Sequence, residues 1–199
     1  MFGSVFVISA AAAFCCSDFS DKTINYEIMT GHTRADSFFG RAIPTVAFGV
    51  VGFMALLLIP SAVLIAVFGW AEYISLGDLL LRMLLLGVIE GRLACEFVFI
   101  SFIVKHRFAV MAGGYVLTMA AFSMPFLSES TSQLLALTNM NLISRIDSWA
   151  SFGLQGSINF VYEAAIDPQT ALSTLLYSAV FAGAFLLLGY SYFKRDDIN

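Results

Sequence analysis

Four charged residues lie inside an otherwise apolar segment of the chain, residues 79–104. They are Arg82, Glu90, Arg92 and Glu96. On a helix they share one half of the circumference, and Arg92 and Glu96, four positions apart, can pair. A charge near the middle of a membrane span costs about 3 kcal/mol unless it is paired or hydrated. The pattern predicts either a polar face lining a cavity or mobile interface, or an ion-paired contact between packed helices.

The other residues that could do chemistry do not form a known site. His32 and His106 lie beside apolar segments, and neither has a second ligand at a metal-binding spacing. The cysteines are odd in number and lie in apolar surroundings, which favours small buried residues over a disulfide framework. No nucleophile elbow, zinc-protease motif, phosphate loop or nucleic-acid pattern is present. We therefore expect neither an enzyme nor a chain with its own metal or cofactor, and no nucleic-acid partner.

The composition is that of a membrane protein. Hydrophobic residues make up 59% of the 199 residues and charged residues 12%, about half the usual charged fraction of a soluble domain. Long uncharged runs suffice to cross a bilayer, which takes about 20 residues. We predict an all-α, polytopic transmembrane bundle of about five spans with short interfacial helices, forming one domain over 1–199. The predicted spans are about 1–16, 42–70, 79–104, 108–127 and 171–193.

Basic residues predict the orientation of these spans. The segments 17–41 and 105–107 and the C-terminal tail hold seven of the ten Lys and Arg residues. With alternating spans these three regions fall on one side, which the positive-inside rule makes cytoplasmic. The segment 128–170 then forms an outer loop, in which apolar residues at near-helical spacing predict short amphipathic helices. The protein is expected in the cell membrane of a bacterium, with a cytoplasmic C-terminus and lipid contacts.

The cytoplasmic segment 17–41 predicts a short helix over Asp21–Thr30. Ile24, Ile28 and Met29 can form one apolar face of this helix. Gly31 suits the left-handed position that follows a helix end. The sequence therefore predicts an interfacial helix of about ten residues that stops at Gly31.

Two local signals predict the starts of long helices. Thr33 and Asp36 have the spacing of a capping box, so the second span is expected to begin near Arg34. Asp167 and Pro168 suit the N-cap and first position of the last span. The glycine pairs Gly113-Gly114 and Gly183 with Gly189 predict close helix packing.

The segment from Thr23 to Arg34, followed by Phe38-Phe39-Gly40-Arg41, resembles the cytoplasmic loop of type-2 ABC (ATP-binding cassette) exporter permeases. That loop typically has Gly-Thr-Ile-Lys-Asn, then Gly-x-Ser-Arg, an aromatic residue and a Lys. The matching positions are Thr23, Ile24, Gly31, Thr33 for Ser, Arg34, Phe38 and Arg41 for Lys. The tail from Tyr192 to Asp197 resembles the family's ending as well. Lys22, Asn25 and Tyr26 depart from the pattern without changing the register.

The resemblance implies the transmembrane subunit of an ATP-driven exporter. The short helix would dock into a separate ABC ATPase subunit, which binds the ATP and Mg²⁺, and a second permease copy or a homologous permease would complete the pore. The residues expected at the ATPase contact are Thr23, Ile24, Asn25, Glu27, Ile28, Gly31 and Arg34.

Family members usually have six spans, and their motif loop lies between the second and third. Only sixteen apolar residues precede the loop here, so we expect the first span to be missing, through either a fragment or a misassigned start. A non-transporting membrane scaffold or immunity protein is the alternative function. An intramembrane enzyme is a weaker alternative, because only the carboxylates and arginines of 79–104 are available.

Overall fold

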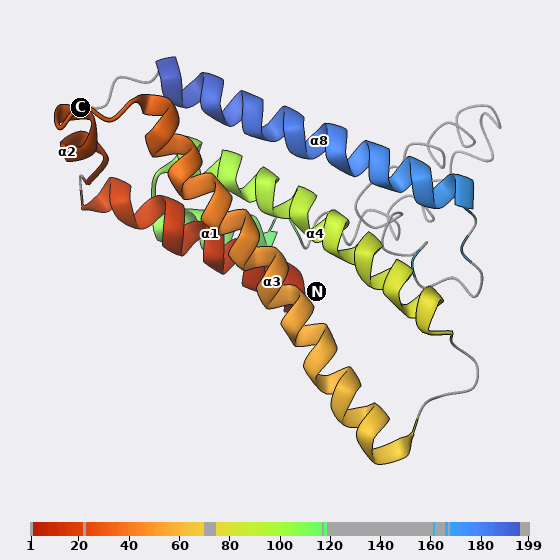
Figure 1. Ribbon diagram of the computed structural model, residues 1–199. Coiled ribbons are helices and arrows are strands. Elements are labelled where there is room, and N and C mark those ends of the chain that lie inside the picture. Colours follow the sequence, from red (N-terminus) through yellow and green to blue (C-terminus); the bar gives the residue numbers. More distant parts are fainter. Residues whose placement is uncertain are drawn as a thin grey trace, which may run out of the picture.

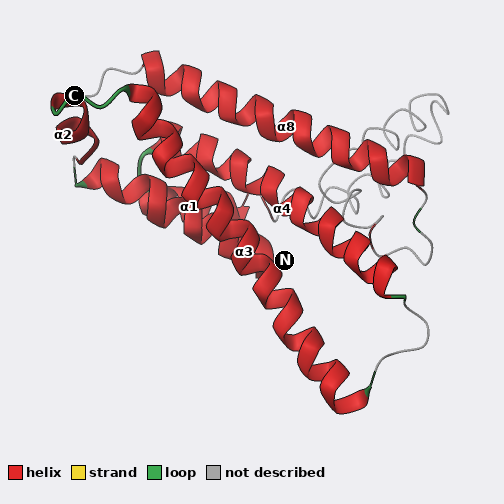
Figure 2. Cartoon of the chain, in the orientation of Figure 1, coloured by secondary structure: helices red, strands yellow, loops and turns green. Residues whose placement is uncertain are grey.

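The computed structural model describes residues 2–21, 23–69, 75–116, 118, 161, 166 and 168–195. This part of the chain is all-α and contains six helices (Figures 1 and 2). Their bounds are α1 Phe2–Ser20, α2 Thr23–Met29, α3 Arg34–Phe68, α4 Leu76–Val104, a helical segment at 107–116, and α8 Pro168–Arg195. The predicted all-α class is thus confirmed for the described residues.

Local capping chemistry sets the ends of the long helices. The Thr33 hydroxyl accepts a hydrogen bond from the Asp36 amide, and the Asp36 side chain accepts from the Thr33 amide, which completes the predicted capping box at the start of α3. Gly69, with a φ of 81°, follows the last residue of α3. At the start of α4 the Ser75 hydroxyl accepts a hydrogen bond from the Asp78 amide. Pro168 takes the first position of α8, as predicted, whereas Asp167 lies outside the described residues.

Helix α4 lies at the centre of the bundle. It packs against α8 on one side and against α1 and α3 on the other (Figure 1). One apolar cluster joins five of these elements through Cys15, Ile24, Phe38, Phe102 and Phe193. The segment 107–116 packs on α1 through Val110, which contacts Ala12 and Cys16. These contacts bring the end of α1, all of α2, the start of α3 and the C-terminal turns of α4 and α8 to one end of the bundle, which we call the α2 end.

The far half of α3 leaves the bundle. Phe53 is the last buried residue of this helix, and α3 diverges from α4 beyond it (Figure 1). The most apolar stretch of α3 is only 6% buried, which distinguishes it from the core helix of a soluble protein. Helices α3 and α8 are both long and apolar enough to cross a membrane.

The helix bounds can be compared with the predicted spans. Helices α3, α4 and α8 contain or nearly contain the predicted spans 42–70, 79–104 and 171–193, and α1 ends four residues beyond the predicted run 1–16. Only residues 108–116 and 118 are described within the predicted span 108–127. Only residues 161, 166 and 168–170 are described within the predicted outer loop 128–170, so its amphipathic helices stay a prediction.

Candidate functional site

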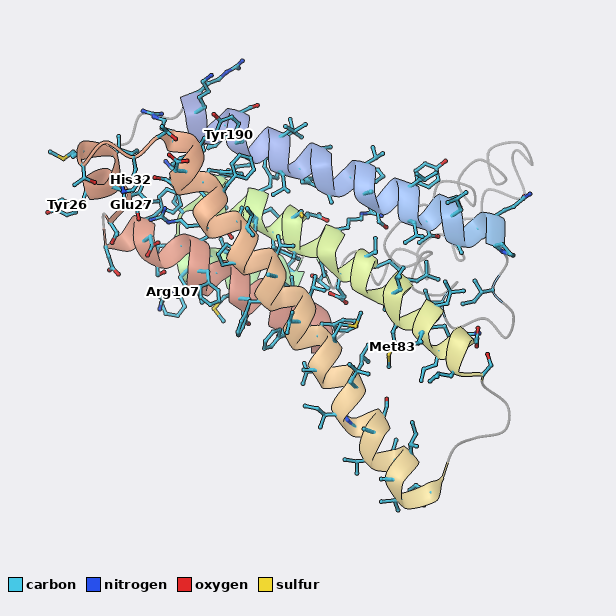
Figure 3. The ribbon with its side chains drawn as sticks, viewed as in Figure 1. Tyr26, Glu27, His32, Met83, Arg107 and Tyr190 are labelled. Carbon is cyan, nitrogen blue, oxygen red and sulfur yellow. The ribbon has the colours of Figure 1, made fainter. Side chains whose placement is uncertain are left out.

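Helix α2 has one face in the core and one face in solvent. Ile24 is 1% exposed and packs with Cys15 and Phe38, and Ile28 packs partly against the same cluster. Tyr26 and Met29 are 68% and 82% exposed, and Tyr26 points away from the other helices (Figure 3). The prediction that Met29 shares the apolar face of Ile24 is therefore wrong. On a helix of 3.6 residues per turn, Met29 lies roughly 140° from Ile24, which turns it outward.

The end of α2 is built as the sequence predicts. Gly31 has a φ of 98°, a left-handed conformation that favours glycine. The Gly31 amide donates to the carbonyl of Ile28, and the His32 amide donates to the carbonyl of Glu27. These bonds satisfy carbonyls that the helix end leaves open. The short helix is confirmed, as Thr23–Met29 rather than Asp21–Thr30.

Glu27 faces the neighbouring helices and forms an ion pair with Arg41. Its two carboxylate oxygens accept from the two terminal nitrogens of the guanidinium, at 2.9 and 3.0 Å. The Ser37 hydroxyl donates to Glu27 at 3.0 Å. The hydrogen bond from Arg41, and then that from Ser37, lower the pKa of Glu27 below its ordinary value. Glu27 is thus a carboxylate held by α3.

Arg41 was matched in the sequence only to a basic position of the family loop, yet it is central to this site. Its side chain is 8% exposed. In addition to Glu27 it binds the carboxylate of Asp18 in the last turn of α1, with an Nε–Oδ2 distance of 2.7 Å. Asp18 is 23 residues from Arg41, so no helical spacing could have identified the pair. The arginine joins α1, α2 and α3.

Arg34 binds the end of α8. Its Nη1 donates to the carbonyl oxygens of Phe193 and Lys194, at 3.3 and 2.9 Å. A cation at a helix C-terminus interacts favourably with the helix dipole and with carbonyls that lack a helical partner. The first residue of α3 thereby fixes the last turn of α8 at the α2 end.

A hollow of about 290 Å³ opens beside α2. Three of its seven lining residues are carboxylates, and the lining comes from the end of α1, from α2 and the turn after it, and from the start of α3. The lining residues are Asp18, Glu27, His32, Asp36, Ser37, Gly40 and Arg41. Of the other residues predicted to face an ATPase, Thr23 is exposed, and the side chain of Asn25 is outside the described part.

The charged residues of α4 do not form one site. Arg82 pairs with Asp78 at 2.9 Å and donates to the carbonyl of Val161. Arg92 is 9% exposed, and its guanidinium lies over the ring of Phe181 in α8, 4.4 Å from the centroid. No ion pair between Arg92 and Glu96 forms in the described structure, because the guanidinium turns toward α8 instead.

Among the described residues, two buried side chains of α4 have atoms without a hydrogen-bond partner. Glu90 is 5% exposed and its Oε2 is unpartnered, as are Nε and Nη1 of Arg92. Glu90 and Arg92 are two positions apart, which places them on nearly opposite sides of α4. The described residues hold no group of three His, Cys, Asp or Glu side chains that could bind a metal, and the three cysteines are buried and form no disulfide.

The residues of the loop motif are therefore brought together at the α2 end, whereas those of the α4 charged face are dispersed. Comparisons of the chain with protein-family models, with curated proteins and with solved structures found no match.

Proposed function

We propose that this chain is the transmembrane subunit of an ATP-driven ABC exporter, and that α2 docks on a separate ATPase subunit. One observation carries the proposal. A seven-residue helix lies outside the ends of the long helices, anchored inward by Ile24 and directing Tyr26 and Met29 outward. A large exposed aromatic side chain beside an exposed methionine is typical of a protein contact.

The position of α2 within the bundle supports the docking role. The segments rich in Lys and Arg, 17–41, 105–107 and 194–195, all belong to the α2 end. Lys105 lies over the ring of Phe19, 5.7 Å from its centroid, and Arg34 binds the end of α8. The positive-inside rule then makes the α2 end cytoplasmic, where an ATPase and its ATP are found.

The proposal includes a membrane bundle of five spans. Helices α1, α3, α4 and α8, together with the helix that begins at 107, would cross the cell membrane with the C-terminus inside. The far half of α3 would then face lipid, which accepts its exposed apolar side chains without cost. ATP and Mg²⁺ would bind to the ATPase, and this chain would couple hydrolysis to export without being an enzyme itself. A second permease would complete the pore.

Co-purification tests the docking face directly. The chain is expressed with the ABC ATPase encoded by a neighbouring reading frame, and the pair is purified through a tag on this chain. We expect the wild-type chain to retain the ATPase and to change its rate of ATP hydrolysis. The double variant Tyr26→Glu, Met29→Glu should lose the ATPase, because two buried charges would face the apolar contact.

Phe108→Glu is the matched control. Phe108 is 74% exposed and lies outside α2, at the same end of the bundle. This variant should retain the ATPase. Retention by the Tyr26 and Met29 double variant would show that α2 is not the docking element. If the wild-type chain binds no ABC ATPase, the exporter assignment itself is wrong.

A further inference from the structure

One arginine side chain is bonded to three helices. Arg41 lies in the second turn of α3, and its Nη1 also donates to the Ser37 carbonyl of that helix at 2.8 Å. Its Nε binds Asp18 of α1 at 2.7 Å, and its terminal nitrogens bind Glu27 of α2 at 2.9 and 3.0 Å. Every nitrogen of the guanidinium therefore has an acceptor, and the group is 8% exposed.

We propose that Arg41 is a positioning residue that transmits a displacement of α2 to α1 and α3 together. The inference depends on the proposed function in one respect, namely that a docked ATPase is what displaces α2. A helix of seven residues is too short to hold its own shape in water, so its position depends on its contacts. Ile24 and Ile28 supply an apolar contact, which resists separation but has little directional preference.

The guanidinium supplies the direction that the apolar contact lacks. It is planar, and a two-point bond to a carboxylate fixes both distance and orientation. Glu27 accepts in this two-point manner, and the Ser37 hydroxyl holds the same carboxylate from α3. A movement of Glu27 therefore moves Arg41, and with it the first turns of α3 and the last turn of α1. A lysine at position 41 has one nitrogen and could not hold both carboxylates in fixed orientations.

The link from Arg41 to α2 and the link from Arg41 to α1 use different carboxylates, Glu27 and Asp18, so each can be removed separately. Glu27→Gln keeps one acceptor oxygen but removes the charge and the two-point bond to α2, while the bond from Arg41 to Asp18 remains. Asp18→Asn weakens the link to α1 and leaves that to α2. Each variant leaves Arg41 with one charged partner. Asp18 and Glu27 are also about one-third exposed, at 33% and 35%, so the chain should still fold.

Hydrogen exchange of the purified chain in detergent measures each link without an ATPase. Glu27→Gln should raise the exchange rates of the α2 amides about five- to tenfold and leave the last turn of α1 unchanged. Asp18→Asn should do the reverse, and Arg41→Lys should raise both. Arg34→Gln, a control on the same helix, should affect the last turn of α8 alone. If Arg41→Lys leaves α1 and α2 unchanged, the arginine does not link these helices and the inference is wrong.

The coupling step is then measured with the ATPase present. Spin labels on Cys residues placed at the exposed Thr30, which follows α2 and is not among the residues expected at the ATPase contact, and at Val63, in a chain whose native cysteines are replaced, report whether ATP changes the separation of α2 and the far half of α3. In the Glu27→Gln variant, retained ATPase binding with loss of that ATP-dependent change supports transmission through Arg41. Retention of the change overturns it. If the wild-type chain and the ATPase form no complex, the exporter assignment is wrong. The hydrogen-exchange result would still show whether Arg41 links α1 and α2.

Discussion

The Glu27 carboxylate makes the attachment of α2 sensitive to acid. Its pKa is lower in the folded chain than in the unfolded chain, because Arg41 and Ser37 donate to the charged form. Its contribution to stability is therefore fully present above the ordinary value of about 4.5 and is lost as the pH falls through the lower folded value. Since the group is one-third exposed, the contribution is at most about 1 kcal/mol.

We predict that α2 amides exchange faster as the pH is lowered below 4.5, after correction for the intrinsic pH dependence of exchange. Glu27→Gln should remove this dependence and show weak protection at every pH. A Ser37→Ala variant, which leaves the ion pair intact, should keep most of it. An equal acid response in Glu27→Gln would assign the effect to another carboxylate.

Residue-level prediction succeeded where neighbours in the sequence interact. Gly31, Thr33 and Asp36 were identified because helix ends use fixed local spacings. The ion pairs of Arg41 span 14 and 23 residues and depend on how three helices pack, so no spacing rule could reveal them. In the described structure Arg92 and Glu96, which can pair by their spacing, form no ion pair within 4 Å, and the guanidinium lies over the ring of Phe181 in α8, a contact that helical spacing could not reveal.

At the scale of the helix, Thr33 fixes where α3 begins. Its hydroxyl accepts from the Asp36 amide at 3.1 Å, and it also donates to the Asp36 carboxylate at 2.6 Å. We predict that Thr33→Ala destabilises the first turn of α3 by about 1 kcal/mol. Faster exchange of the Asp36 and Ser37 amides would report this change. Thr33→Ser keeps the oxygen and should behave as the wild type, and equal effects of the two substitutions would contradict the capping role.

Two glycines of α8, Gly189 and Gly183, have different surroundings. A Cβ at Gly189 would lie 3.3 Å from the Phe38 ring and 3.5 Å from the Phe99 backbone, whereas one at Gly183 would meet nothing within 4 Å. The sequence predicted close packing at both positions. The prediction is confirmed for Gly189, whereas a Cβ at Gly183 would point into space that no described atom fills.

We therefore predict that Gly189→Leu destabilises the fold by roughly 1–3 kcal/mol through overpacking. Gly183→Leu, on the same helix, should have little effect. The midpoints of thermal unfolding in one detergent give the comparison, and the expected order is wild type and Gly183→Leu above Gly189→Leu. Equal midpoints for the two variants would mean that α8 can shift away from α3 and α4 at little cost.

At the scale of the whole molecule, the apolar runs of the sequence predicted α3, α4 and α8 nearly in full. Two of these helices, α3 and α8, are long and apolar enough to cross a membrane. How the helices pack against one another was harder to predict from the sequence. The sequence places 17–41, 105–107 and the tail on one side, and the structure brings the described parts of these segments to the α2 end. The sequence does not predict that α3 diverges from the bundle beyond Phe53, because that depends on which helix faces are covered by other helices.

The two ends of the bundle should lie on opposite sides of the membrane, which labelling can test. Tyr26 at the α2 end and Phe68 at the far end of α3 are 68% and 80% exposed. The native cysteines are buried, so they should react slowly with a maleimide that cannot cross the membrane. In intact cells we expect Phe68→Cys to react and Tyr26→Cys to react only after the membrane is opened. In inverted vesicles the order should reverse, because the basic α2 end then faces the reagent. Labelling of both sites from one side would mean that α3 does not cross the bilayer and that the proposed five-span bundle is wrong.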